Sequence, residues 1–185
     1  MRPLLLLPLA LLASCGPAPL RIAVPPLPTE GQVATSFDSV ELVQVSLPDY
    51  AEADEIFVQG QGGALTQAGG AIWADDPARA LTLDLSRNLA RLTGARVAPE
   101  PYPYEGDPQA RVDIRAETFA PDLTRNAFVI RGQYFVATED GEGDRAREFE
   151  ALGALPPNPG PAAIAAARAQ ATVALAQDIA ANGLR

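Results

Sequence analysis

The sequence predicts a single α+β domain, in which a mostly antiparallel or mixed sheet packs against two main amphipathic helices. Three patterns favour this class. Residues 77–93 repeat leucine at helical spacing, residues 111–117 alternate strictly between polar and apolar side chains, and residues 161–181 form an alanine-rich stretch with one apolar face. The sequence shows no internal repeat and no second domain boundary, so these elements are expected to share one core.

The first half of the domain is expected to contain short strands separated by turns. Residues 40–45 predict a strand that ends before the segment Leu47-Pro48-Asp49-Tyr50, and residues 56–58 predict a second strand after an acidic loop. The glycine-rich residues 60–63 predict a flexible turn that leads into a third strand. Residues 72–75 are expected to form a loop before the first helix.

The first helix is expected to begin at Asp76, an acceptable N-cap, with Pro77 at the first helical position, and to end at Gly94. One side of this helix carries a stripe of leucines, and the basic residues Arg79, Arg87 and Arg91 lie off it. The stripe consists of Leu81, Leu85, Leu89 and Leu92. A leucine stripe packs in a core far more often than it binds a partner, so we expect it to be buried.

The second half of the domain is expected to form an antiparallel hairpin followed by a helix. Residues 111–117, 128–137 and 145–150 read as strands, and the acidic residues 140–144 form the turn between the last two. The alanine-rich helix follows a loop at residues 156–161 and stops at Asn182-Gly183. Its predicted buried face holds Ile164, Ala171, Leu175 and Ile179, and its predicted wetter side holds Arg168, Gln170 and Gln177.

The N-terminus has the pattern of a lipoprotein export signal. Met1-Arg2 precedes an apolar stretch at residues 4–12, and small residues lead to Cys15, the only cysteine. The stretch is too short to span a bilayer, which takes roughly 20 apolar residues, so residues 1–14 are predicted to be cleaved. The pattern resembles the bacterial lipobox, which implies a diacylglycerol group and an N-acyl chain on Cys15 and no other cofactor. The alternative is a secreted protein with an unmodified thiol.

Residues 15–36 are predicted to be a lipidated, proline-rich linker that leads to a domain at residues 37–185. Proline-rich chains extend by about 3.1 Å per residue, so some twenty residues could reach roughly 60 Å. Residues 20–24 alternate and could pair as a short edge strand. Gly16 stands where an aspartate would favour retention at the inner membrane, so we expect an outer-membrane anchor facing the periplasm of a Gram-negative bacterium.

The side-chain composition argues against an enzyme. All fourteen basic residues are arginines, and the chain has neither lysine nor histidine, which removes the commonest general base, the commonest metal ligand and the Schiff-base nucleophile. Carboxylate pairs such as Asp75-Asp76 remain formally available for glycoside chemistry, but a helix cap explains them better. The sequence therefore predicts no catalytic residue and no metal site.

The acidic balance of the chain restricts its partners. The formal net charge is −9, and loss of residues 1–14 with their single arginine leaves −10. Such a surface disfavours nucleic acid and electrostatic adhesion to anionic lipid headgroups. The acyl chains would therefore have to hold the protein at the membrane.

Several segments together resemble one protein family. They are the lipobox, the strand that ends in Val45-Ser46-Leu47-Pro48-Asp49-Tyr50, the segment Ile72-Trp73-Ala74-Asp75, and Asn88-Leu89-Ala90 within the first helix. Their order and spacing resemble the ABC-type transport auxiliary lipoproteins, the PqiC/YmbA-like group of the paraquat-inducible operon. The chain departs from the family pattern at Ala51 to Asp54, an acidic loop where many members carry a leucine and a basic residue, and at Asp76-Pro77.

The resemblance implies a non-catalytic envelope lipoprotein that works with a mammalian-cell-entry (MCE) protein and an inner-membrane component to move lipids between membranes. It also allows a homo-oligomer. The residues that we expect to dock the MCE protein are Pro48, Asp49, Tyr50 and Trp73, because exposed aromatic side chains are good interface anchors. The sequence equally allows Trp73 to fill the core instead, and Tyr102 and Tyr104 raise the same question.

Two other functions stay open at this stage. One is a lipoprotein regulator of a peptidoglycan synthase, which would need the proline-rich linker to stay extended. The other is a direct lipid carrier, which would need a deep apolar cavity in the domain. A carboxylate hydrolase is a distant third possibility.

Overall fold

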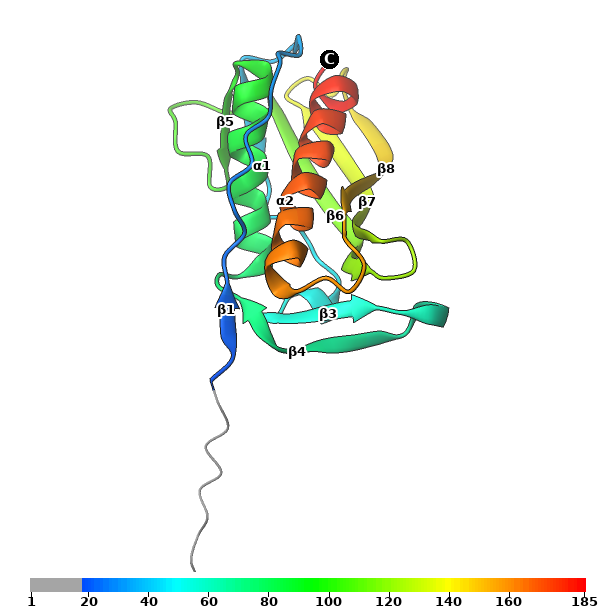
Figure 1. Ribbon diagram of the computed structural model, residues 1–185. Helices are drawn as coiled ribbons and strands as arrows, with labels where there is room; N and C mark the ends of the chain where they lie inside the picture. Colours follow the sequence, from blue (N-terminus) through cyan, green and yellow to red (C-terminus); the bar gives the residue numbers. More distant parts are fainter. Residues whose placement is uncertain (1–17) are drawn as a thin grey trace, which may run out of the picture.

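The computed structural model describes residues 18–185 and has two layers, a mixed sheet of eight strands and a pair of helices lying side by side on one face of it (Figure 1). The predicted α+β class is therefore confirmed. In chain order the elements are β1 (Leu20–Ile22), β2 (Ser39–Leu42), η1 (Asp49–Ala51), β3 (Glu55–Gln59), η2 (Gln61–Gly63), β4 (Leu65–Trp73), α1 (Pro77–Thr93), β5 (Arg96–Pro99), β6 (Ala110–Asp122), β7 (Ala127–Thr138), β8 (Arg145–Ala154), α2 (Pro161–Asp178) and the π-helical turn η3 (Ile179–Gly183).

The sheet is organised around the long hairpin of β6 and β7. On one side β8 pairs with β7 in antiparallel register. On the other side β6 pairs with two short strands in succession, β2 near its start and β3 at its last residue, both parallel to it. β5 continues the sheet from β2, whereas β4 and then β1 continue it from β3. As a result β1, β3 and β4 gather at one end of the molecule, away from the C-terminus (Figure 1).

Helix α1 follows its local signals closely. The side chain of Asp76 accepts a hydrogen bond from the Arg79 N–H at 2.7 Å, and Gly94 ends the helix with a φ of 72°, which favours glycine. The predicted leucine stripe is buried against the sheet and against α2. Leu81, Leu85 and Leu89 have no solvent exposure, and Leu92 is 2 % exposed.

Helix α2 has the predicted buried face, and Ile164, Ala171, Leu175 and Ile179 all lie in the core. The prediction that Arg168 lies on the wetter side is wrong, because this side chain is only 1 % exposed. The reason is that α2 packs against β7 and β8 as well as α1, so most of its circumference is covered. Only a narrow strip that includes Gln170 and Gln177 faces solvent.

Several strand boundaries differ from the sequence prediction. β2 ends at Leu42 because the ladder with β6 is interrupted at Val45, whose N–H donates to the hydroxyl of Thr82 in α1 at 2.9 Å. The pairing resumes at Ser46, whose N–H donates to the Ile114 carbonyl at 3.0 Å. The expected loop at residues 72–75 is wrong in its first half, since β4 continues through Trp73. β5 has four residues and no alternation that would have indicated it.

The proline-rich segment lies along α1 toward the C-terminal end of the molecule (Figure 1). β1 is the predicted short edge strand and pairs with β4. Further along, the Val33 N–H donates to the Leu92 carbonyl at 2.7 Å, and the Ser36 N–H donates to the Leu184 carbonyl at 3.0 Å. Residues 20–36 therefore follow a helix of 17 residues, about 25 Å long, instead of extending freely over roughly 60 Å.

Candidate functional site

The residues that the sequence singled out lie in three different environments. Cys15, the predicted lipidation site, lies outside the described residues. Pro48, Asp49 and Tyr50 lie beside the end that β1, β3 and β4 form, and Trp73 lies in the core below them.

The loop at residues 48–50 is fixed to the domain by its tyrosine. The Tyr50 hydroxyl accepts a hydrogen bond from the Phe119 N–H at 3.0 Å, and its ring meets Phe57 edge-on with centroids 6.3 Å apart. Pro48 and Tyr50 are half-buried, whereas Asp49 is exposed. Asp49 is therefore the member of this loop most open to a partner.

Trp73 occupies the core, the second of the two positions that the sequence allowed. Its side chain is 3 % exposed and meets Phe128 edge-on at 6.4 Å between centroids. The guanidinium carbon of Arg168 lies 4.5 Å from the Trp73 ring centroid and 4.9 Å from that of Phe119. Trp73 thus supports the end of the domain from inside and offers no exposed ring.

Arg168 is a cation enclosed by this aromatic cluster. Its Nη2 donates to the Pro77 carbonyl at 3.0 Å, while its Nε has no hydrogen-bond partner among residues 18–185. Burial lowers the pKa of the guanidinium to about 10, and the carboxylates of Asp84, Asp75 and Asp76 oppose that shift in part. The group is therefore protonated at neutral pH, and its contacts with the two rings offset part of the desolvation cost.

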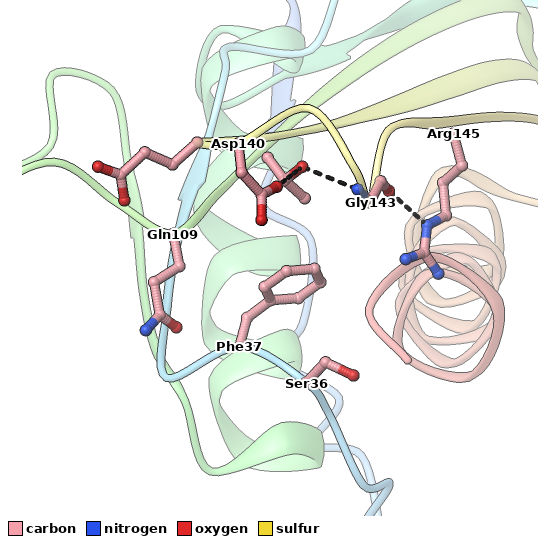
Figure 2. A pocket seen from close by; sticks show the side chains of 8 residues that line it. Ser36, Phe37, Gln109, Asp140, Gly143 and Arg145 are labelled. Atoms are coloured by element: carbon pink, nitrogen blue, oxygen red, sulfur yellow. Dashed lines mark hydrogen bonds between the residues drawn. The ribbon is translucent and has the colours of Figure 1, made fainter.

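A second surface feature lies at the opposite end of the molecule, beside the C-terminus. It is an open cleft of about 610 Å³, shown in Figure 2. The segment before β2 supplies Phe37, the β7–β8 turn supplies Glu139 and Asp140, and the start of β8 supplies Arg145. The remaining lining residues are Ser36, Gln109, Thr138 and Gly143.

Hydrogen bonds hold the β7–β8 turn in place at this cleft. The Thr138 hydroxyl accepts from the Gly143 N–H at 3.1 Å and bonds to the Asp140 carboxylate at 3.0 Å (Figure 2). Arg145 donates through Nε to the Gly143 carbonyl and through Nη1 to the Arg185 carbonyl. The cleft therefore has a hydrogen-bonded rim that carries acidic and basic side chains, and the Phe37 ring lies within it.

Sequence reasoning identified residues 140–144 as a turn but missed this cleft. It forms because the docked proline-rich segment, the residues before β6 and the β7–β8 turn meet at one place, and nothing local in the sequence indicates that meeting. The described part of the chain contains no group of three His, Cys, Asp or Glu side chains placed to hold a metal ion. Of the helices in residues 18–185, none has the length and hydropathy needed to cross a bilayer.

Comparison with known families gives the decisive observation. Residues 22–180 match the family described as ABC-type transport auxiliary lipoprotein component. The chain belongs to this family. The match begins at Ile22, the last residue of β1, and ends at Ala180 in η3, so it includes residues 22–36 of the docked proline-rich segment. No curated protein matches this auxiliary lipoprotein.

Solved structures share the fold of the auxiliary lipoprotein. A crystal structure of an uncharacterized protein superposes with a TM-score of 0.71 at 20 % identity, over 89 % of this chain and 97 % of that one. Protein XCC0632 from Xanthomonas campestris, of family DUF330, superposes with a TM-score of 0.66 at 22 % identity, over 90 % of this chain and 93 % of that one. At these identities the two likenesses establish the fold.

Proposed function

We propose that this lipoprotein is an outer-membrane-anchored periplasmic adaptor, the non-catalytic auxiliary subunit of an MCE/ABC-type system that transports lipids between membranes. The family match supports a role as a transport auxiliary component. The lipobox pattern at Cys15 supports anchorage, and Gly16 supports the outer membrane over the inner one. The absence of lysine and histidine from the chain supports a role without catalysis.

The observation that carries the adaptor role is the filled interior of the domain. One continuous apolar cluster joins both helices to the sheet. The void among Tyr50, Ile56, Trp73 and Phe128 holds only about 10 Å³, far below the roughly 300 Å³ at which small-ligand pockets begin. The larger hollows, of about 610, 390 and 310 Å³, are open surface clefts with several charged residues in their linings. A direct lipid carrier would need an enclosed apolar cavity instead.

The docked proline-rich segment disfavours a regulator that reaches a distant cell-wall enzyme. Such a regulator needs the segment extended, whereas backbone hydrogen bonds at Val33 and Ser36 hold it against α1 and the C-terminus. Two surfaces remain as places where the MCE protein could dock. They are the loop around Asp49 that the sequence predicted, and the cleft lined by Phe37 and Arg145.

The proposal is tested by purifying the tagged full-length lipoprotein from detergent-solubilised envelopes after brief cross-linking, and identifying the co-purifying proteins by mass spectrometry. The matched control is Cys15→Ala. We expect an MCE-domain protein among the partners, in reduced yield with the control. Recovery of a cell-wall synthase in place of the MCE protein would show that the proposal is wrong.

A further inference from the structure

We propose that the end of the domain formed by β1, β3 and β4, here called the hairpin end, lies on the phospholipid surface of the membrane that holds the anchor. The contact would orient the domain, so that the cleft beside the C-terminus faces the periplasm. This inference rests on the proposed lipidation of Cys15, and it adds a surface to which neither the family description nor the solved structures assign a role.

The first argument is the short distance between the anchor and the hairpin end. Leu20, the first residue of β1, follows Cys15 by five positions. Five residues span at most about 17 Å even when fully extended. β1 is fixed to the hairpin end, because it pairs with residues 71–73 of β4 and the Ala74 N–H donates to the Ile22 carbonyl at 2.9 Å. An acylated Cys15 would therefore hold this end of the domain close to the lipid surface.

The second argument is the distribution of charge. Residues 56–74, which include most of β3 and all of β4, contain no charged side chain, although one residue in five of the whole chain is charged. Most of this stretch is not buried, and residues 61–67 are all exposed. A charged surface must lose hydration to approach lipid, whereas glycine, glutamine, threonine and leucine can enter the headgroup region at much lower cost.

The third argument is the apolar and backbone surface that the hairpin end presents. Leu20 is 60 % exposed and Leu65 is 37 % exposed. β1 covers only residues 71–73 of its edge of β4, and no other described strand pairs with that edge at residues 65–70. Two leucines add little to the affinity of several acyl chains. Their role would be to fix which face of the tethered domain meets the membrane.

The charged residues of the hairpin end, Arg21 of β1 and Glu55 of β3, lie away from the uncharged turn between β3 and β4. Arg21 and Asp54 form an exposed ion pair at 3.3 Å at the border of the hairpin end, and Glu52 lies beyond them. From this border α1 runs about 25 Å toward the C-terminal end. The structure therefore separates a membrane-facing end, in which residues 56–74 carry no charge, from a distal end that carries the acidic turn at residues 140–144.

The lipoprotein offers a direct test, because its only cysteine would be blocked by the diacylglycerol thioether and a new cysteine can be labelled alone. The variants Leu65→Cys, Leu27→Cys and Gln109→Cys place an environment-sensitive fluorophore at the hairpin end, beside α1 and at the distal cleft. All three positions are exposed. Each labelled full-length lipoprotein is reconstituted into phosphatidylcholine vesicles with and without a lipid that carries a nitroxide quencher on its headgroup.

We expect the label at position 65 to lose most of its fluorescence in quencher vesicles, the label at 27 to lose less, and the label at 109 to lose least. Equal quenching at 65 and 109 would overturn the orientation. A change at position 65 that depends on protein concentration in detergent, without vesicles, would show that a second copy covers the hairpin end instead. Flotation of the protein with the vesicles is measured in the same samples, and failure to float would show that the anchor itself is absent.

Discussion

Arg168 and Trp73 form a cation–π pair inside the core, with the guanidinium carbon 4.5 Å from the tryptophan ring centroid. Arg168 comes from α2 and Trp73 from the last residue of β4. The same guanidinium donates to the Pro77 carbonyl in the first turn of α1. One buried side chain therefore connects both helices to the strand that leads to the hairpin end.

This connection predicts that Arg168 stabilises the fold more through packing than through its charge. Arg168→Ala should lower the free energy of unfolding by about 3 kcal/mol, because it leaves a cavity beside Trp73 and removes the hydrogen bond to the Pro77 carbonyl. Arg168→Met fills much of the same space without a buried charge and should retain most of the stability. The measurement is urea unfolding followed by Trp73 fluorescence, and equal losses in the two variants would show that the charge itself is required.

The addition of a single methyl group at Gly153 is expected to destabilise the fold severely. A Cβ at this position would lie 1.8 Å from the Ala167 carbonyl oxygen, because α2 rests directly on the backbone of β8. Gly153→Ala should therefore push α2 away from the sheet and cost about 3 kcal/mol or more. Gly69→Ala is the matched control, since nothing lies within 4 Å of that position. Thermal unfolding of the two variants compares them, and a Gly153→Ala protein as stable as the control would contradict the close packing.

The parts of the fold that were predictable from sequence are those with local causes. The cap at Asp76, the leucine repeat and Gly94 specify α1, and strict alternation specifies the core of β6. Gly153 and Arg168 show why the rest was not predictable. The glycine is needed only because a helix far along the chain packs on it, and the long arginine side chain can leave the polar side of its helix to reach a tryptophan at a distance in sequence.

The candidate site was predictable only in part for the same reason. The lipobox at Cys15 and the order of the family segments are local patterns, and the family match agrees with that resemblance. The cleft is different, because Phe37, Gln109 and Arg145 come from three separate segments that meet only in the folded chain. Likewise, the proline content of residues 17–28 indicated an extended chain but not the backbone hydrogen bonds by which Val33 and Ser36 attach the segment to α1 and to Leu184.

Asp122, the last residue of β6, is expected to make a contribution to the free energy of unfolding that depends on pH. Burial opposes its ionisation, but the Thr124 hydroxyl and the backbone N–H groups of Thr124 and Arg125 donate to its carboxylate and lower its pKa. A carboxyl whose pKa is lowered on folding stabilises the fold above its unfolded pKa, and this contribution is lost as the pH falls through the folded value.

The variant Asp122→Ala should therefore unfold more easily than the wild type at pH 7, by about 1–2 kcal/mol. The difference between the two proteins should shrink as the pH falls below about 4. Urea unfolding at a series of pH values measures it. A difference that stays constant down to pH 2 would show that the turn depends on side-chain shape and not on the ionised carboxylate.

The last prediction separates the two candidate docking surfaces. If the hairpin end rests on the membrane, the loop at Asp49 lies near the lipid and the distal cleft faces any partner that crosses the periplasm. Glu139 lines that cleft and is exposed, with no side-chain hydrogen bond among the described residues. Glu139→Arg should therefore reduce the yield of the cross-linked MCE-domain protein severalfold without changing the thermal stability, because a reversed charge within an interface disturbs its electrostatic complementarity. Asp49→Arg makes the same charge change on another exposed carboxylate and should leave the yield near that of the wild type. A loss of partner with Asp49→Arg and not with Glu139→Arg would assign docking to the loop that the sequence alone predicted.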